Sequence, residues 1–352
     1  MSRMKYAVGV MVGSSLDGMD MVGVRWNIKR PSIFVLEQSA TVPLPQEWKQ
    51  WIEHRCFTNI SYCALHREEI RFSRWVARQI KAFVKEHHPE VIGFHGPTLY
   101  HDETGPISYQ WGDGAFLYGD LAIPVVVDFR AVDQALGGAG APILSYVEHL
   151  AFPDYDGTLN LGGIANISFA KGEHHGRDVV PCNQLLNRLA HERGAPYDCN
   201  GEWARQGKVN PSLLMDLQLI QCDWIAQSLD RKEIFEVYWP VLEHYKACPL
   251  GDRLRTVVEF IAQSIAQVVP PDARVLVTGG GVHHSFLMER VCALSSATFE
   301  IPDRQIVDYK EAMLIALMAL LRLYQLPNTY LSYQAGLTAG ALWGASGRSQ
   351  KD

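Results

Sequence analysis

The sequence lacks the patterns that mark a disulfide-stapled, zinc-binding or membrane-spanning protein. Its seven cysteines are scattered and no two form a CxxC pair, which favours reduced thiols in a cytosol over a disulfide framework or a zinc site. No apolar run approaches the roughly 20 residues of a membrane span. Residues 1–6 are basic but lead into no hydrophobic segment of a signal peptide. We therefore expect a cytoplasmic protein that does not bind membranes.

Positive charge is also in short supply. Lys and Arg number 32 against 38 Asp and Glu, which gives a formal net charge of −6. This charge argues against a protein that binds nucleic acids or anionic membranes in general. The 352 residues, 47% apolar and 20% charged, have a globular composition. Because a chain of this length is too long for a single hydrophobic core, we expect two lobes of about 150 residues each. The glycine-rich loop 137–142 places their boundary near residue 145, giving lobes 1–145 and 146–352.

Glycine is plentiful, and it stands where apolar strands end. Residues 6–26 and 157–169 both read as strand, glycine turn and returning strand. We interpret this echo as a diverged duplication, with one copy opening each lobe. A third strand, 273–278, runs through glycines into a helix. Strands that alternate with helices expected at 66–86, 184–193, 253–268 and 310–325 predict an α/β fold.

The first glycine hairpin has the composition of a phosphate-binding loop. Consecutive turn amides form a concave nest of donors for an anion, and Ser14 and Ser15 add hydroxyl groups. Asp17 can hold a divalent metal, directly or through water. The alternative interpretation is a hairpin turn with no ligand.

Several short motifs, in order along the chain, resemble one known family, the anhydro-N-acetylmuramic acid kinases. Residues 9–20 are similar to its amino-terminal signature, Gly-x-Met-Ser-Gly-Thr-Ser-x-Asp-Gly-x-Asp. Residues 95–98 resemble its His-Gly-Gln-Thr, and residues 110–113 resemble its Gln-Ile-Gly-Asp. The remaining matches are 128–130, 137–142, 160–166, 197–201 and 279–281. The resemblance covers roughly residues 6–315.

The resemblance implies two ribonuclease-H-like lobes of the actin, hexokinase and Hsp70 superfamily, with ATP and Mg²⁺ in a cleft between them. It assigns two phosphate loops, one per lobe, that grip the same polyphosphate, and a glycine loop against the nucleoside. The implied ATP-binding residues are Gly13, Ser14, Ser15, Asp17 and Gly18 in the first loop, Gly162, Gly163 and Asn166 in the second, and Gly279, Gly280 and Gly281 at the nucleoside. Asp17 is the implied magnesium ligand.

The implied reaction needs a base, because water opens the 1,6-anhydro bridge of the sugar while O6 takes the γ-phosphoryl group of ATP. The family's base lies in a Phe-Asp-Thr-Gly-Pro-Gly-Asn stretch, which corresponds here to residues 177–183. Asp178 is therefore the candidate base and Asn183 a candidate substrate contact. Without the resemblance, Asp178 reads as a solvated loop carboxylate or a cap. This segment departs from the family at residues 179, 180 and 182, as do Val12 and Pro97 in the earlier motifs.

Three further residues are implied contacts of the anhydro amino sugar. Arg130 presents a planar fork that suits the lactyl carboxylate, although an ion pair with Asp128 or Asp133 is an equal reading. Glu311 matches an acidic family position, or is a first-turn helix charge. His95 either contacts the sugar or is a structural histidine.

Two rival functions remain at this point. The first is a kinase for another sugar or polyol on the same fold, in which Asp178 deprotonates a substrate hydroxyl directly. The second is a non-catalytic nucleotide-binding regulator, which the departures at residues 179–182 favour. The family also implies a homodimer.

Overall fold

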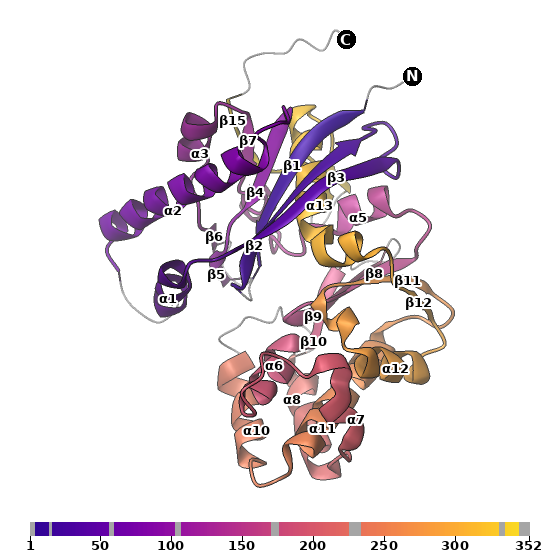
Figure 1. Cartoon of the computed structure of the whole chain (residues 1–352). Coiled ribbons are helices and arrows are strands. Elements are labelled where there is room, and N and C mark those ends of the chain that lie inside the picture. Colours follow the sequence, from indigo (N-terminus) through magenta and orange to yellow (C-terminus); the bar gives the residue numbers. More distant parts are fainter. Residues whose placement is uncertain are drawn as a thin grey trace. The chain divides into compact units, whose positions relative to one another are not determined.

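The structure is a computed structural model that describes residues 4–13, 16–55, 60–102, 107–169, 176–224, 234–330 and 335–344. The chain forms two compact units, drawn in Figure 1. Unit 1 comprises residues 1–153 and 309–352, and unit 2 comprises residues 154–308.

Unit 1 contains a six-stranded sheet in the order β15-β7-β4-β1-β2-β3. Its strands are β1 (Lys5–Val12), β2 (Gly18–Trp26), β3 (Phe34–Pro43), β4 (Val91–His95), β7 (Val125–Val127) and β15 (Ala341–Trp343). The first three strands are antiparallel to their neighbours, whereas β1, β4 and β7 run parallel. The carboxyl ends of β1 and β4, which carry two of the family-like motifs, therefore reach the same edge of the sheet.

Side-chain alternation along β1 explains how helices cover both faces of this sheet. Val8 and Val10 face a core formed with α2 (Tyr62–Phe83), whose apolar residues recur at helical spacing. Gly9 and Gly93 face the opposite side, where α13 (Arg304–Leu323) packs directly on the strand backbones. Figure 1 shows α2 and α13 on opposite faces.

Unit 2 contains a five-stranded sheet in the order β10-β9-β8-β11-β12. Its strands are β8 (Gly157–Leu161), β9 (Ile164–Phe169), β10 (Gly176–Pro181), β11 (Arg274–Thr278) and β12 (Thr298–Glu300). The first three are antiparallel neighbours, and β8, β11 and β12 run parallel. One face forms a core with α6 (Asn183–His191), α8 (Pro211–Trp224), α11 (Leu250–Val268) and α12 (Ser285–Leu294).

The two sheets share one topology. In each unit three antiparallel strands come first in sequence, and the first strand then pairs in parallel with the fourth in the order third-second-first-fourth-fifth. This is the strand order of a ribonuclease-H-like lobe, which confirms the predicted α/β class with two similar lobes of the actin, hexokinase and Hsp70 superfamily. The expected duplication is visible in the topology, whereas the interlobe cleft stays a prediction.

Shorter elements complete the described chain. The shorter helices are α1 (Gln46–Arg55), α3 (Gly114–Leu121), α4 (Ala131–Ala135), α5 (Ser145–Ala151), α7 (Glu202–Gln206) and α10 (Trp239–His244). A π-helical turn lies at Ile234–Tyr238, and 3₁₀ turns lie at Cys199–Gly201 and Gly280–His283. Two strand pairs form separate sheets: β5 (Thr98–Asp102) with β6 (Ile107–Gln110), and β13 (Thr329–Tyr330) with β14 (Ala335–Leu337). Within the described ranges, the helices are all too short or too polar to span a bilayer.

The unit boundaries differ from the division into 1–145 and 146–352. The last 44 or so residues belong to unit 1 because α13 lies against Gly9 and Gly93 and because β15 pairs with β7. Unit 2 is thus one continuous segment inserted between the two parts of unit 1. Glu311 consequently lies in the same unit as His95 and Arg130.

Candidate functional site

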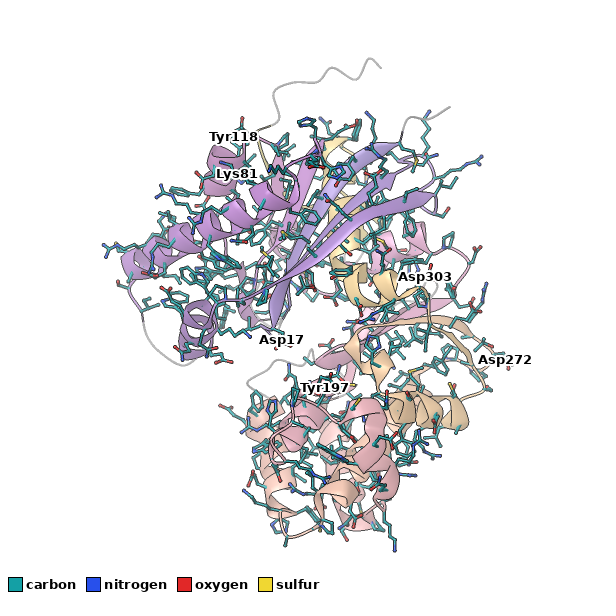
Figure 2. The ribbon with its side chains drawn as sticks, viewed as in Figure 1. Asp17, Lys81, Tyr118, Tyr197, Asp272 and Asp303 are labelled. Atoms are coloured by element: carbon teal, nitrogen blue, oxygen red, sulfur yellow. The ribbon has the colours of Figure 1, made fainter. Side chains whose placement is uncertain are left out.

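The first glycine hairpin joins β1 to β2 in unit 1. Leu16 closes the turn by donating its N–H to the carbonyl of Gly13, 3.1 Å away. A β-carbon at Gly13 would meet no atom within 4 Å, so space is open beside this backbone. Asp17 is exposed at the start of the returning strand (Figure 2). Ser14 and Ser15 lie outside the described residues, so their predicted roles remain predictions.

Gly18 is required by packing. A β-carbon at this position would lie 2.7 Å from Cγ2 of Thr41 on β3. The glycine therefore allows β2 and β3 to approach each other. Gly18 was predicted to bind nucleotide, and this packing is a structural reason for a glycine at its position.

His95 ends β4 with 4% of its surface exposed. Burial lowers the pKa of His95 to about 3, and the nearby Arg130 cation acts in the same direction. The imidazole is therefore neutral at ordinary pH and offers one donor and one acceptor.

Glu311 lies within α13, seven residues after Arg304 begins the helix, so the alternative interpretation as a first-turn charge is wrong; it adjoins a buried ion pair. Lys310 Nζ contacts Glu148 Oε1 at 2.5 Å, which ties α13 to α5. Burial raises the pKa of Glu311; Lys310 and Arg130 oppose this shift, whereas Glu148 and Asp20 add to it. This carboxyl group thus stands in a confined position with two cations and two carboxylates around it.

Arg130 links these observations, because its charge acts on the pKa of both His95 and Glu311. Its Nη1 donates to the carbonyl of Gly140 at 2.7 Å, and Asp133 Oδ2 accepts from the N–H of Gly140 at 2.7 Å. Both side chains therefore hold the 137–142 loop. The structure brings three of the four predicted substrate contacts together in unit 1, whereas Asn183 belongs to unit 2, and the roles of all four stay predictions.

Asp20 was not singled out from the sequence, although it ends the amino-terminal motif. It accepts a hydrogen bond of 2.6 Å from Oγ1 of Thr41 and lies close enough to raise the pKa of Glu311. Its place in the motif was the signal that could have identified it.

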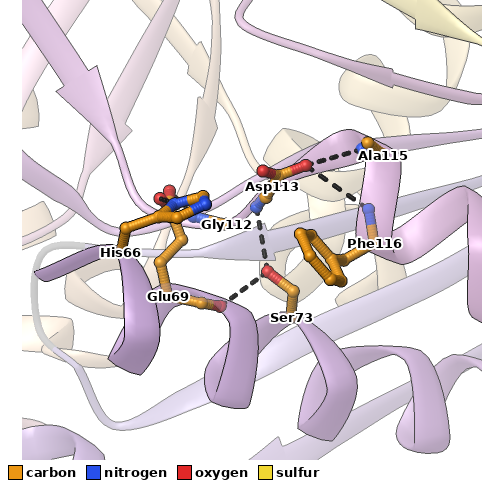
Figure 3. A network of polar contacts seen from close by, with 7 residues as sticks. All are labelled: His66, Glu69, Ser73, Gly112, Asp113, Ala115 and Phe116. Carbon is orange, nitrogen blue, oxygen red and sulfur yellow. Dashed lines mark hydrogen bonds and ion pairs between the residues drawn. The ribbon is translucent and has the colours of Figure 1, made fainter. Parts of the chain in front are cut away.

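A polar network orders the 110–114 motif of unit 1 (Figure 3). Glu69 on α2 accepts from the N–H of Gly112 at 3.1 Å, and Ser73 Oγ accepts from the N–H of Asp113 at 2.9 Å. Asp113 in turn caps α3 by accepting from the N–H groups of Ala115 and Phe116. Gly112 and Asp113 therefore have structural roles in this chain.

In unit 2, two glycine loops follow parallel strands that are direct neighbours. Thr278 at the end of β11 is paired with Asn160 near the end of β8. Gly279 has φ +88°, and a β-carbon there would lie 2.5 Å from Asn160 Oδ1. One at Gly281 would lie 2.7 Å from Leu161 Cβ. Ligands of open α/β sheets bind beyond such carboxyl ends, so Gly279, Gly280 and Gly281 adjoin the second predicted phosphate loop.

The carbonyl groups of that second loop hold the start of α6. Gly162 O accepts from the N–H of Asn183 at 3.2 Å, and Gly163 O accepts from the N–H groups of Cys182 and Gln184. Asn183 Nδ2 donates to Leu161 O at 2.9 Å. Asn183, a predicted substrate contact, is therefore engaged in joining α6 to the hairpin.

Asp178 lies on β10, directly opposite Asn166 on β9 in the antiparallel register. The register shifts between Asp178 and Val180, which places a β-bulge at Val179. Bulges redirect side chains next to active sites. The structure thus brings the predicted base beside Asn166 of the predicted phosphate loop, with its side chain half-buried.

Burial accounts for the residues that depart from the family pattern in this segment. Val179 and Val180 are 5% and 0% exposed and both pack in the core of unit 2. Cys182 is fully buried at the cap of α6, and burial raises the pKa of its thiol to about 12. These substitutions are therefore accommodated as core residues, and Cys182 is not a nucleophile.

The 197–201 motif is structural in its described contacts. Asp198 accepts from the N–H groups of Trp203 and Ala204 and so begins α7. Gly201 has φ +74°, and a β-carbon there would lie 2.3 Å from His284 Cε1. Tyr197 is exposed at the edge of this motif (Figure 2).

The residues present fit a magnesium nucleotide. Gly279 and Gly281 are required by packing against Asn160 and Leu161, whereas a β-carbon at Gly280 would meet only Asn183 Nδ2, at 3.9 Å, so the backbone between them is open to a close approach by a ligand. Mg²⁺ is usually held by one or two carboxylates together with substrate phosphates, and the exposed carboxylate of Asp17 is a ligand of that kind.

Comparison with known proteins identifies relatives over almost the whole chain. The chain matches the family model for anhydro-N-acetylmuramic acid kinase over residues 5–346. A curated anhydro-N-acetylmuramic acid kinase from Vibrio cholerae is 34% identical over 93% of this chain and 94% of its own length. Another from Pasteurella multocida is 32% identical over 99% of this chain and 98% of its own.

Among solved structures, the chain is similar to the activator of 2-hydroxyisocaproyl-CoA dehydratase from Clostridium difficile with bound ADPNP. The TM-score is 0.46 at 12% identity, over 89% of this chain and 94% of that one. On the sequence matches over almost its full length, the chain belongs to the anhydro-N-acetylmuramic acid kinase family.

Proposed function

We propose that this protein is an ATP-dependent kinase that opens 1,6-anhydro-N-acetylmuramic acid and phosphorylates O6, yielding N-acetylmuramic acid 6-phosphate for the recycling of peptidoglycan. The observation that carries the proposal is the pairing of Asp178 with Asn166 beside the glycine hairpin, in a chain that belongs to this family.

Apart from the proton transfer, the proposed reaction makes two bonds and breaks two. Asp178 accepts a proton from water, and the water oxygen bonds to C1 of the sugar while the bond from C1 to O6 breaks. The freed O6 bonds to the γ-phosphorus of ATP, and the bond from that phosphorus to the bridging oxygen breaks to release ADP. Positioning and charge neutralisation supply most of the catalysis in phosphoryl transfer.

Each set of residues has one task in this proposal. Asn166 and the glycines of unit 2 bind the nucleotide. In unit 1, Gly13, Ser14 and Ser15 add phosphate contacts, and Asp17 would hold Mg²⁺, which neutralises phosphate charge when bound. Arg130 binds the lactyl carboxylate, and His95 and Glu311 contact the sugar.

A kinase for another sugar is the same-fold alternative. Release of ADP separates the possibilities when it is measured with no sugar, with anhydro-N-acetylmuramic acid and with a simple hexose. We expect the anhydro sugar alone to accelerate release. Acceleration by the hexose instead would favour the alternative, and no response to any sugar would favour a nucleotide-binding regulator.

Three secondary features are part of the proposal. Magnesium dependence follows from the role of Asp17, a cytoplasmic location from the scattered cysteines, and a homodimer from the family. Removal of Mg²⁺ with a chelator is expected to abolish turnover and to be reversed by adding the metal back.

A further inference from the structure

The amide group of Gln184, a residue that is otherwise partly exposed, is buried without polar partners. Gln184 is the second residue of α6. Both its Nε2 and its Oε1 are inaccessible to solvent, and neither has a hydrogen-bond partner in the part of the chain that the structure describes. An amide has two donor hydrogens and an acceptor oxygen. The hydrogen-bonding groups of Gln184 are therefore unsatisfied in this structure.

The amide lies against the turn of the second predicted phosphate loop. A β-carbon built on Gly163 would stand 3.0 Å from Cγ and 3.1 Å from Nε2 of Gln184. The backbone of the same residue is fixed, because its N–H donates to Gly163 O at 3.2 Å. The side chain is thus held over the hairpin while its amide remains unused.

Another glutamine of unit 2, Gln221, shows how a buried amide is hydrogen-bonded when it supports the fold. Gln221 is also buried, but its Nε2 donates to Val179 O at 2.6 Å and its Oε1 accepts from Tyr238 at 2.7 Å. A buried amide with such bonds contributes to stability, whereas one without them is destabilising relative to an apolar residue of the same size. Gln184 therefore weakens the ligand-free fold at this point.

We propose that Gln184 is a nucleotide-binding residue whose amide turns out of its solvent-inaccessible position when nucleotide binds, so that Nε2 donates to a phosphoryl oxygen held at the β8–β9 turn. This inference rests on the proposed function. A phosphoryl oxygen is the acceptor expected beside Gly163, because this turn is the second predicted phosphate loop. Bound nucleotide supplies the hydrogen bond that the polypeptide does not.

Replacement of Gln184 by Met tests the assignment, because Met has a similar length and no polar amide. Two quantities are measured on the full chain: the dissociation constant of a non-hydrolysable ATP analogue, by calorimetry, and the melting temperature without ligand. We expect Q184M to bind the analogue about 10-fold more weakly or worse, as loss of a hydrogen bond to a charged group requires. Its ligand-free melting temperature is expected to equal or exceed that of the wild type.

Two further variants make the result decisive. Gln221→Met is the matched control and is expected to lower the melting temperature, because its removal breaks two buried hydrogen bonds. Gln184→Glu keeps the shape but replaces the donor by a negative charge, and it is expected to weaken nucleotide binding further than Met does.

Unchanged affinity for the analogue in Q184M would overturn the inference, as would a fall in melting temperature as large as that of Gln221→Met. A rise in the KM for the anhydro sugar with unchanged nucleotide affinity would assign the amide to the sugar and also overturn it. Failure of the wild type to bind the analogue would sink the proposed function together with the inference, whereas the preceding outcomes leave the kinase proposal standing.

Discussion

The imidazole of His95 makes the unfolding of this protein sensitive to acid. Its pKa is about 3 in the folded chain, against roughly 6.5 when unfolded. Between these values the unfolded state binds one more proton than the folded state. The contribution of His95 to stability is therefore complete above pH ~6.5 and falls by about 1.4 kcal/mol per pH unit as the pH drops toward 3.

We predict that His95→Leu shows a shallower loss of stability below pH ~6.5 than the wild type. Urea unfolding at several values between pH 7 and 5 measures the slope. His88→Leu is the control for the same change of side chain at an exposed position. Parallel slopes for wild type and His95→Leu would contradict a neutral buried imidazole.

The carboxylate of Asp178 gives the second prediction at this scale. Asp178→Asn keeps the size of the side chain but cannot accept a proton from water, so turnover is expected to fall about 100-fold or more while nucleotide affinity is retained. Steady-state kinetics and calorimetry measure the two quantities.

Asp272→Asn is the matched control because Asp272 is an exposed carboxylate of unit 2 with φ +59° (Figure 2), a conformation that Asn also adopts. We expect its turnover to match the wild type. Normal turnover in Asp178→Asn would remove Asp178 from the role of base.

At the scale of elements, α13 owes its position to two glycines in the sheet beneath it. A β-carbon at Gly9 would lie 1.7 Å from Ala312 O, and one at Gly93 would lie 2.5 Å from Ile315 O. The helix therefore rests on bare strand backbone, and Glu311 precedes the point of closest approach.

We predict that Gly9→Ala destabilises the protein by about 3 kcal/mol or more, because overpacking at a backbone contact forces α13 away from β1. It is also expected to raise the KM for the sugar, since Glu311 moves with the helix. Gly119→Ala on α3 is the control, where a β-carbon meets no atom within 4 Å. Equal melting temperatures for the two variants would contradict the packing argument.

Sequence reasoning reached the elements whose signals are local. Strand–glycine–strand patterns predicted both hairpins, and helical spacing predicted α2, α6, α11 and α13 to within a few residues at most ends. It also selected His95, Arg130 and Glu311, which the structure groups in unit 1.

The features that the sequence alone did not predict depend on contacts between segments that are distant along the chain. Glu69 and Ser73 stand within the apolar spacing of α2, yet their partners lie about 40 residues away at 112 and 113. The contact of α13 with Gly9 joins segments that are even further apart in the sequence. The buried amide of Gln184 had no local signal, because only the folded chain shows that its partners are missing.

For the whole molecule, the inserted arrangement of unit 2 has a consequence for folding. Residues 154–308 contain all five strands of their sheet, so we predict that this fragment unfolds cooperatively on its own. Residues 1–153 lack α13, whose residues 312–321 are buried, and are expected not to fold alone.

A matched design joins residues 1–153 to 309–352 through a short flexible linker in place of unit 2. We expect this protein to regain cooperative urea unfolding, monitored by circular dichroism. Cooperative unfolding of residues 1–153 by themselves would contradict the assignment of the carboxyl-terminal segment to unit 1.

Identification of the product tests the central claim most directly. The full-length protein is incubated with ATP, Mg²⁺ and 1,6-anhydro-N-acetylmuramic acid, and the sugar is analysed by mass spectrometry and phosphorus NMR. Our account predicts a sugar heavier than the substrate by one water and one phosphoryl group, with phosphate on O6 and one ADP formed per sugar. An anhydro sugar recovered intact, or phosphorylated with its bridge unopened, would contradict it.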